Sequence, residues 1–292
     1  MPELPEVETI VLGLKQKVLK RTFVDAWTDF KKIIKKPKNF EEFKKELKGK
    51  KIEDIKRRAK NILFYLSSDK VLLIHQKLTG HLLLGKWQKE NERWRSLFPG
   101  PLSDDPMNKF LHLIFFLDDG NQIALSDVRK FAKVELWQKK ELEKSKDFKN
   151  LGPEPLKKDF TLGKFKKILL KKKGKIKQVL MDQTVIAGIG NIYSDEALWW
   201  ARVNPQKEIK NLSQKELKDI YQAIKKVLKK GIEFQGESIS DFRKVDGTRG
   251  DFDRWRKVYR KEKQKCQRCG EIIQRKKMGG RSAHYCPNCQ KL

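Results

Sequence analysis

The chain has 292 residues, and its 68 Lys and Arg against 38 Asp and Glu leave a formal net charge of +30 at pH 7. This length allows two or three domains with cores of their own, and 7 Trp and 16 Phe exclude a disordered basic tail. A charge this positive predicts a polyanionic partner, nucleic acid first, because neutralised phosphates release counterions. A compositional lysine bias explains part of it, in the runs 164–177 and 225–230. The chain has no apolar run of about eighteen residues and no signal-peptide layout, so we expect a cytoplasmic protein without a membrane partner.

The first ten residues, Met1 to Ile10, have two interpretations. Prolines, glutamates and an apolar stripe at helical spacing predict the start of a helix that ends near Lys20. Alternatively, removal of Met1 exposes the secondary amine of Pro2 beside two glutamates. An amine that forms an iminium with a carbonyl carbon is a covalent catalyst. The segment alone favours the helix start.

Residues 22–135 are predicted to be mostly β, in two packed sheets with one helix outside. The expected strands are Lys51–Ile55, Ile62–Ser67, Val71–Gln76, His81–Trp87, Leu111–Leu117 and Gln122–Ser126. Asp119-Gly120 predicts a hairpin between the last two strands. The stretch from Lys89 to Asn108, rich in Gly and Pro, is expected to be a long loop.

The character changes near Asn150, where Leu151-Gly-Pro-Glu-Pro155 predicts a break, and helical periodicity follows. One helical region is expected over 161–181, interrupted at Gly174. A Ser-x-x-Glu box at Ser213 begins another helix, which is expected to stop before Gly231. Between them, the turn 187–193 opens a helix to about Ala201. Two glycines at a helix start suit phosphate binding, although such a turn is equally typical of a tight helix connection.

All 4 cysteines lie near the C-terminus as Cys266-x2-Cys269 and Cys286-x2-Cys289. Two such pairs, each on one tight turn, predict a closed four-thiolate site for one structural zinc ion, with a short hairpin between them. Disulfides or free thiols are the alternative, and the clustering disfavours a disulfide framework. We expect the zinc to hold a basic arm against a phosphate backbone.

Taken together, these motifs resemble the formamidopyrimidine-DNA glycosylase family. The motifs are Pro2-Glu3, Arg57-Arg-Ala-Lys60, Asp127-Val-Arg-Lys-Phe131, Leu151 to Pro155, Met181-Asp, Gly188 to Tyr193 and the four-cysteine finger. They occur in the family's order and cover essentially the whole chain. The resemblance implies base-excision repair of oxidised purines in double-stranded DNA, by a glycosylase that is also a lyase.

The resemblance also implies an α+β multidomain fold. We expect an N-terminal β-sandwich catalytic domain over 1–135, a linker over 136–160, a helix–two-turns–helix domain over 161–245 and a zinc finger over 246–292. The protein is expected to act as a monomer on damaged duplex DNA.

The resemblance implies roles for five catalytic residues. Pro2 is the nucleophile at C1′ of the flipped nucleotide, Glu3 the proton donor and Glu6 its supporting carboxylate. Lys60 handles a proton in β-elimination and Arg281 in δ-elimination. Without the family context, Lys60 is one solvated lysine among many and Arg281 a phosphate clamp.

The family fills the gap left by the flipped nucleotide with three side chains, which correspond to Leu78, Arg129 and Phe131. Further DNA contacts implied by the resemblance are Lys172, Lys177, Asn191, His75 and Lys109. The sequence departs from the family pattern at Leu78, where methionine is more common. It departs again at Phe110, where a DNA-contacting histidine is often found. The segment 236–242 resembles the family's mobile loop over the flipped base.

Two other functions stay open from the sequence. One is an endonuclease VIII-like glycosylase for oxidised pyrimidines, which uses the same Pro2 and Glu3 chemistry; Leu4, Ser238 and Phe242 favour the purine enzyme. The other is a non-enzymatic zinc-ribbon DNA-binding protein that relies on the charge and the cysteine finger alone.

Overall fold

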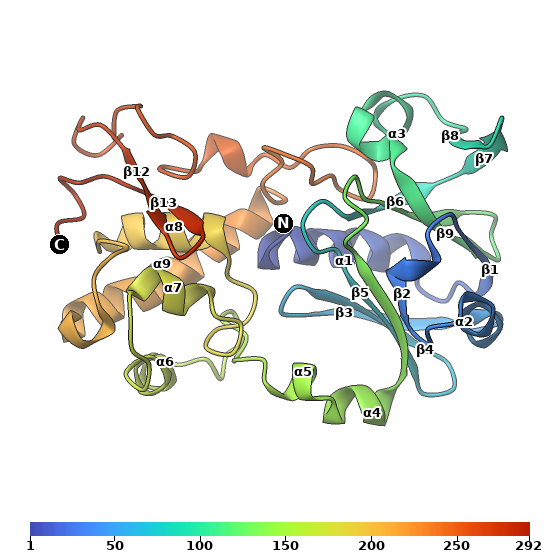
Figure 1. The fold of residues 1–292 in the computed structure, drawn as a ribbon, viewed down its shortest axis with the longest axis horizontal. Coiled ribbons are helices and arrows are strands. Elements are labelled where there is room, and N and C mark those ends of the chain that lie inside the picture. The colour runs from blue at the N-terminus through green and yellow to red at the C-terminus, as the bar shows by residue number, and fades with distance from the viewer. The chain divides into compact units, whose positions relative to one another are not determined.

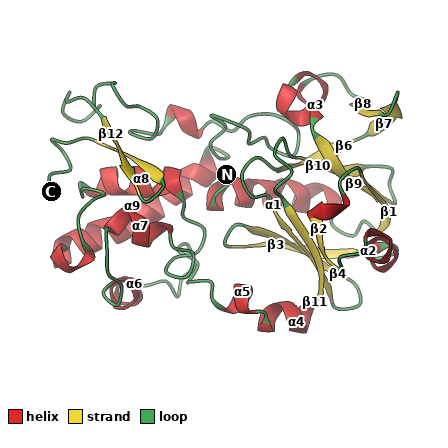
Figure 2. Cartoon of the chain, viewed as in Figure 1, coloured by secondary structure: helices red, strands yellow, loops and turns green.

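The computed structural model describes all residues from 1 to 292 and divides them into two compact units. The first unit comprises Met1–Lys149 and Phe234–Asp253, and the second comprises Asn150–Glu233 and Arg254–Leu292. The first is built mainly from strands and the second mainly from helices (Figures 1 and 2). The predicted α+β fold is confirmed. The four domain limits expected from the sequence remain predictions.

The first unit contains two sheets of four and five strands. Their strands are β1 (Phe23–Thr28), β2 (Ile34–Lys36), β3 (Ile52–Arg58), β4 (Asn61–Leu66), β5 (Lys70–His75), β6 (His81–Gly85), β9 (Leu111–Leu117), β10 (Gln122–Ser126) and β11 (Lys133–Gln138). The orders are β1-β9-β10-β6 and β2-β11-β5-β4-β3. Neighbours are antiparallel except β2 and β11, which are parallel. The hairpin expected at Asp119-Gly120 joins β9 to β10, with Gly120 at φ 77°.

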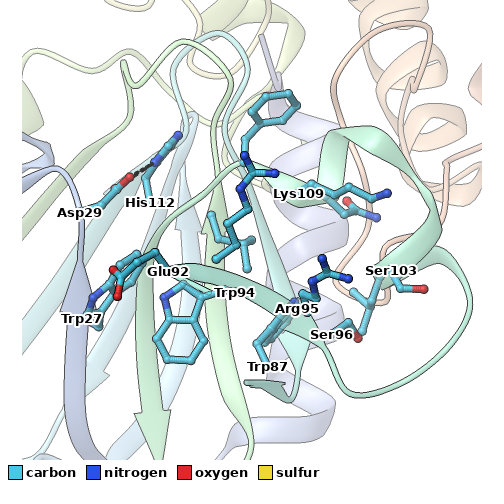
Figure 3. A pocket seen from close by; sticks show the side chains of 15 residues that line it. Trp27, Asp29, Trp87, Glu92, Trp94, Arg95, Ser96, Ser103, Lys109 and His112 are labelled. Carbon is cyan, nitrogen blue, oxygen red and sulfur yellow. Dashed lines mark hydrogen bonds and ion pairs between the residues drawn. The ribbon is translucent and has the colours of Figure 1, made fainter. Parts of the chain in front are cut away.

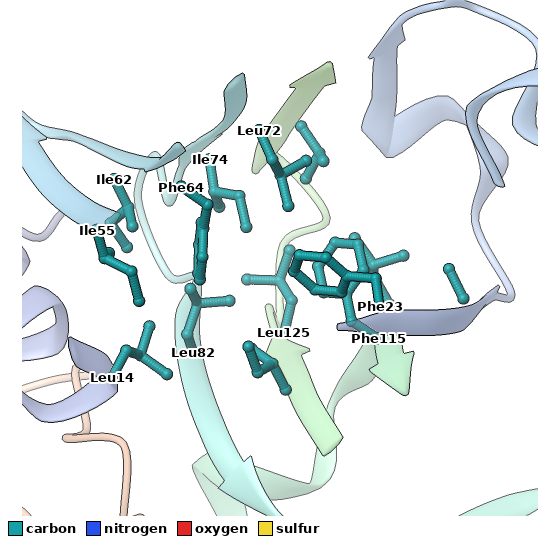
Figure 4. Packing of buried hydrophobic residues seen from close by; sticks show 14 of the residues in the cluster. Leu14, Phe23, Ile55, Ile62, Phe64, Leu72, Ile74, Leu82, Phe115 and Leu125 are labelled. Carbon is teal, nitrogen blue, oxygen red and sulfur yellow. The ribbon is translucent and has the colours of Figure 1, made fainter. Parts of the chain in front are cut away.

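The core of this unit lies between the two sheets (Figure 4). Phe23 connects them, because its ring contacts Phe115 of one sheet at 5.5 Å between centroids and Phe64 of the other at 6.2 Å. Edge-on contacts of this kind add to the free energy gained by burying the rings. The sandwich expected from the sequence is therefore present.

Helix α1 (Leu4–Val18) covers one edge of this core. Its stripe of Val7, Ile10, Val11 and Leu14 is buried, as the helical spacing predicts. Four further short helices belong to the same unit. They are α2 (Phe40–Leu47), α3 (Pro101–Asp104), α4 (Lys139–Lys144) and α5 (Lys146–Lys149). Only one helix is predicted for this part of the sequence. The strands β1, β2 and β11 were also not among the expected ones.

The expectation of a long loop over 89–108 was wrong. This stretch forms part of a hairpin, β7 (Trp87–Glu90) and β8 (Arg93–Ser96), followed by α3 and a 3₁₀ turn, Pro106–Lys109. Asn91 and Glu92 have positive φ values of 45° and 66°, the conformation of the tightest two-residue hairpin turns. The hairpin is stable because its tryptophans pack on the outer face of the four-stranded sheet.

The second unit is built around helices. They are α6 (Leu162–Leu169), α7 (Ile176–Met181), α8 (Asn191–Ala201) and α9 (Gln214–Glu233). The interruption expected at Gly174, which has φ 99°, separates α6 from α7. Helix α9 begins with the expected box, since Ser213 and Glu216 exchange hydrogen bonds. It runs three residues past the expected stop, because burial of its apolar stripe outweighs the cost of about 1 kcal/mol for Gly231.

The C-terminal part of the second unit is a hairpin of β12 (Gln274–Met278) and β13 (Arg281–Tyr285), as expected between the cysteine pairs. None of the helices combines the length and the apolar character that a membrane span needs.

Candidate active site and metal centre

The residues that follow Met1 are buried inside the first unit, whereas Met1 itself is 41% exposed. Pro2 and Glu3 are both buried, and α1 begins at the next residue. The Glu3 backbone N–H donates to Oε2 of Glu6 at 2.7 Å, while the Glu3 carboxylate accepts from the Glu6 backbone N–H. This reciprocal capping holds both carboxylates beside the chain terminus.

A second segment is fixed to the same carboxylate. The backbone N–H of Glu237 donates to Oε1 of Glu6 at 2.9 Å. Gly236, at φ 88°, allows this approach, because a Cβ there would lie 3.0 Å from Cγ of Glu6 and 2.9 Å from the ring of Phe242. Glu6 therefore joins the helix start to the segment 236–242.

Four charged side chains act on the terminal amine. Burial lowers the pKa of the Met1 amino group from its usual 8.0; the carboxylates of Glu3, Glu6 and Asp241 oppose this shift, and Lys60 adds to it. An amine at this place is therefore more often neutral than a solvated one. Asp241 was not among the predicted site residues. The only sequence signal for it is its place as an acidic residue inside the segment 236–242, the expected mobile loop.

Lys60 is only 5% exposed and lies in the β3–β4 turn. The turn is held by Arg57, whose Nε donates to Oε2 of Glu8 on α1 at 2.6 Å and whose Nη1 donates to the carbonyl of Ala59 at 3.0 Å. Ala59 has φ 52°. The turn that carries Lys60 is thus fixed to the helix that follows the terminus.

Two neighbouring loops carry the three predicted wedge residues. Asp127 connects them: its carboxylate accepts from the Thr79 hydroxyl and from the backbone N–H groups of Arg129 at 3.3 Å and Ala132 at 2.8 Å. Phe131 is 51% exposed, and the guanidinium of Arg129 lies 4.7 Å from its ring. Leu78, next to Thr79, is half-buried. An exposed aromatic ring beside an arginine can insert between base pairs.

Two further predicted DNA contacts lie in this unit. His75 ends β5, and its Nδ1 accepts from the backbone N–H of Lys77 at 3.0 Å. Burial, together with Lys77, Lys60 and Lys133, lowers the pKa of His75 to about 3, so the ring is neutral at physiological pH. Lys109 is exposed at the end of the 3₁₀ turn that precedes β9.

In the second unit, the glycine turn precedes α8. Gly188, at φ 91°, donates its N–H to Oε1 of Gln183 at 2.9 Å, and the Gln183 amide donates to the carbonyl of Ile189 at 2.7 Å. Asn191 begins the helix, and its Oδ1 has no hydrogen-bond partner. Lys172 is half-buried, and its Nζ lies 3.9 Å from Asp182.

Lys177 differs from the expectation of a phosphate contact. The side chain is 1% exposed, its Nζ forms an ion pair with Asp195 and donates to the carbonyl of Ser282 at 2.7 Å. Asp195 also accepts from the backbone and ring of His284, both at 2.9 Å. Lys177 therefore fastens the β12–β13 hairpin to α7 and α8, and its ammonium does not face solvent.

Arg281 is exposed at the start of β13, beside the turn formed by Gly279 and Gly280. A Cβ at Gly279 would lie 2.3 Å from Nε2 of Gln178, so the hairpin tip approaches α7 closely. The position of Arg281 is thereby fixed relative to its own unit.

The four cysteine sulfurs lie within 4.8 Å of one another. Zn–S bonds of about 2.3 Å in a tetrahedron place sulfurs about 3.8 Å apart, so these residues fit a closed four-thiolate zinc site. The indole N–H of Trp199 donates to Sγ of Cys266 and the backbone N–H of Cys289 to Sγ of Cys286, both at 3.4 Å. Such donors stabilise thiolate ligands. The cysteines form no disulfide.

The fold and these clusters define a class: DNA-repair glycosylases with an N-terminal sandwich, a helix–two-turns–helix domain and a zinc finger. Three family descriptions match the chain. They are the formamidopyrimidine-DNA glycosylase N-terminal domain over 1–134, the formamidopyrimidine-DNA glycosylase H2TH domain over 151–243, and the zinc finger found in FPG and IleRS over 263–292. The chain belongs to the formamidopyrimidine-DNA glycosylase family.

Relatives and solved structures agree with this membership. A Pelotomaculum thermopropionicum protein named formamidopyrimidine-DNA glycosylase is 40% identical over 100% of both chains. A Streptococcus pneumoniae protein of that name is 38% identical over 100% of this chain and 99% of its own. The structure of Lactococcus lactis Fpg in complex with abasic-site DNA is 34% identical in sequence and has a TM-score of 0.86. The structure of its complex with Fapy-dG DNA is also 34% identical and has a TM-score of 0.85. Each alignment covers 99% of this chain and 100% of the other chain.

Proposed function

We propose that this protein excises oxidised purines, such as 8-oxoguanine and formamidopyrimidines, from duplex DNA and then cleaves the abasic strand. The observation that carries this proposal is the start of the chain, where Pro2 is buried and the charges of Glu3, Glu6, Asp241 and Lys60 act on the Met1 amine. The Lactococcus lactis structures, which hold DNA with Fapy-dG or an abasic site, support the substrate class.

The nucleophile is the amine of Pro2 after Met1 has been removed. Its lone pair attacks C1′, the glycosidic bond breaks, and the base leaves with the bonding electrons and takes up the proton that the Pro2 nitrogen loses. Glu3 protonates the ring oxygen O4′ as the sugar opens, which leaves an iminium at C1′. Burial lowers the pKa of the Met1 amine, and burial of Pro2 would act in the same direction on its own amine once Met1 is removed, which supports a neutral nucleophile.

Strand cleavage follows from the acidity that the iminium gives to C2′–H. Lys60 accepts that proton, and the C3′–O bond breaks, so that the downstream strand leaves with a 5′-phosphate. Arg281 assists the second elimination, in which C4′ loses its proton, the C5′–O bond breaks and the upstream strand leaves with a 3′-phosphate. Water then hydrolyses the imine and frees Pro2. Glu6 takes no proton in this scheme, since two backbone N–H groups occupy its oxygens.

DNA is held by contacts that position the duplex without reading its sequence. Leu78, Arg129 and Phe131 fill the gap of the flipped nucleotide, and His75, Lys109, Lys172 and Asn191 contact the backbone. Lys177 is not included, because it is buried. One structural zinc ion, held by Cys266, Cys269, Cys286 and Cys289, keeps the hairpin with Arg281 in place. We propose that the protein acts as a monomer.

Borohydride trapping on a duplex with 8-oxoguanine tests the mechanism. Wild-type protein should form a covalent adduct, and Pro2→Gly should lose at least about a hundredfold in trapping rate, since the secondary amine is gone. Pro5→Ala is the matched control, because Pro5 lies in the same helical turn without being a terminus. The intact mass of the purified protein reports whether Met1 is absent.

The outcomes separate the competing functions. Preferred excision of thymine glycol over 8-oxoguanine would assign the chain to oxidised pyrimidines instead. Tight DNA binding without any adduct, or equal trapping by Pro2→Gly, would sink the covalent mechanism and leave a zinc-finger DNA-binding protein.

A further inference from the structure

A pocket of about 730 Å³ lies beside the β7–β8 hairpin, away from the residues of the proposed mechanism (Figure 3). Its lining comes from β1, the hairpin, α3 and residues 108–112, all in the first unit. This volume lies within the range of sites for small organic ligands. Neither the terminus nor Lys60 lines it, so it is a second site.

One wall of the pocket is aromatic. The ring of Trp94 meets Trp27 edge-on at 5.2 Å between centroids, and Trp87 is buried in the cluster against which both pack. Nε1 of Trp94 is buried without a hydrogen-bond partner. A ligand with a flat ring would stack on the indole faces that line the pocket.

A histidine with a fixed orientation also lines the pocket. Nδ1 of His112 lies 2.9 Å from each carboxylate oxygen of Asp29 (Figure 3). This contact holds the imidazole ring, and both residues belong to the lining. The pocket therefore contains a hydrogen-bonding pair in addition to its aromatic surface.

Three cations belong to the lining of the pocket. They are Arg93, Arg95 and Lys109, and all three side chains are exposed. The only ion pair among them joins Nε of Arg95 to Glu90 at 3.5 Å, and both side chains are largely exposed, so it is easily exchanged for another anion. Lys109 is also one of the proposed DNA contacts, which places the pocket next to a surface where phosphates are expected.

We propose that this pocket binds one nucleotide unit, with the base against Trp94 and the phosphate at Arg95 and Lys109. Stacking rings and cations in one groove are how proteins hold unpaired nucleotides without reading sequence. A small anion would use the cations but not the tryptophans. The bound nucleotide unit is either an unpaired nucleotide of a DNA strand or a free nucleotide. The inference rests on the proposed function only because that function makes DNA the expected partner.

The test is binding of a short, lesion-free oligothymidylate measured by fluorescence anisotropy. Trp94→Ala and Arg95→Ala should each weaken binding about tenfold. Trp137→Ala and Arg21→Ala are matched controls, because Trp137 is bound to Glu135 in the other sheet and Arg21 is an exposed arginine outside the pocket. Both should bind as wild type does.

Borohydride trapping on a short damaged duplex keeps this inference separate from the proposed function. Both pocket variants should trap at the wild-type rate, and failure of wild type to trap would leave the oligothymidylate result intact. If Trp94→Ala does not fold, Trp94→Phe keeps a ring, and Arg95→Ala tests the pocket by itself.

A photo-crosslink from an oligonucleotide with 5-iodouracil should map to the peptide that contains Trp94. If thymidine monophosphate competes at concentrations near the oligonucleotide Kd, the ligand is a free nucleotide. If it does not compete, the ligand is an unpaired nucleotide of a DNA strand. Unchanged binding in Trp94→Ala and Arg95→Ala, or an equal loss in Trp137→Ala, would overturn the proposal.

Discussion

At the residue scale, both carboxylate oxygens of Glu6 are held by backbone donors. Its Oε2 accepts from Glu3 and its Oε1 from Glu237, so both oxygens are occupied by backbone donors separated by more than two hundred residues. Hydrogen bonds to an ionised acceptor are the stronger kind, and they favour the charged form. We therefore propose Glu6 as a positioning residue and Glu3 as the acid.

Buried His81 makes the stability of the first unit depend on pH. The side chain is 1% exposed and bonded to Asn108 at 3.0 Å, and burial lowers the pKa of His81 to about 4. Below about pH 6.5 the His81 imidazole binds a proton in the unfolded chain but not in the folded chain. The free energy of unfolding therefore falls as the pH falls from about 6.5 to about 4. His81→Gln keeps an amide donor and should remove up to about 1.4 kcal/mol per pH unit of that dependence.

Urea unfolding of wild type and His81→Gln at a series of pH values from 7 to 4 measures this difference. The comparison between the two proteins cancels the carboxylates that titrate in the same range. His112→Gln is a control, because His112 lies on the outer side of its sheet with a carboxylate partner. Parallel curves for wild type and His81→Gln would contradict the prediction.

Residue chemistry that is local in sequence could be predicted, and chemistry that depends on distant partners could not. The cysteine spacing and the terminal Pro2-Glu3 predicted clusters that the structure contains. Lys177 could not be distinguished from Lys172, because its burial depends on Asp195 and on Ser282 of the C-terminal hairpin. A lysine-rich sequence gives no sign of which lysine is buried.

At the scale of elements, the segment 234–253 depends on one crossing of its own backbone. A Cβ at Gly250 would lie 2.2 Å from the carbonyl oxygen of Gln235 and 2.4 Å from that of Gly236. These are backbone atoms that cannot rotate away. Gly250→Ala should therefore displace the segment, break the bond from Glu237 to Glu6, and lower the trapping rate at least about tenfold, equivalent to about 1.4 kcal/mol in the barrier.

Hydrogen exchange of residues 235–242 and borohydride trapping are the two measurements. Gly163→Ala is the matched control, because its Cβ would meet no atom closer than 4.0 Å and alanine favours the helix. Wild-type exchange and trapping in Gly250→Ala would show that the crossing does not hold the segment.

Elements with a regular apolar period were predictable, whereas those stabilised by single aromatic contacts were not. Strands β4, β5, β9 and β10 match the expected runs within one or two residues. The sequence of the β7–β8 hairpin predicts a loop, because Gly and Pro follow it and its outer positions are charged. Its stability comes from Trp87 and Trp94 against a sheet that is assembled from distant segments.

At the scale of the whole molecule, the chain returns to its first unit. Residues 234–253 follow the last long helix of the second unit, yet they make their contacts with the sandwich. The predicted domain limits assign most of these residues to the helix–two-turns–helix domain. No change in composition marks the point where the chain re-enters the first unit. The capping segment of the proposed site is thus supported by the unit that carries Pro2.

Removal of the metal tests how far the two units are independent. Trp199, Cys266 and Cys286 share one buried cluster, so loss of zinc should loosen the C-terminal hairpin that carries Arg281. Metal-free protein should bind damaged duplex at least about tenfold more weakly, a loss of about 1.4 kcal/mol or more. The sandwich, whose core contains no cysteine, should keep its β-sheet circular dichroism.

Zinc content by atomic absorption, duplex binding and circular dichroism should be measured on the same samples before and after chelation. One zinc per chain is expected before chelation. Cys289→Ser should reproduce the metal-free protein, and Lys291→Ser, two residues away and exposed, should behave as wild type. Undiminished duplex binding by protein shown to contain no metal would mean that the hairpin is not held by zinc, and collapse of the sandwich on chelation would mean that the units do not fold independently.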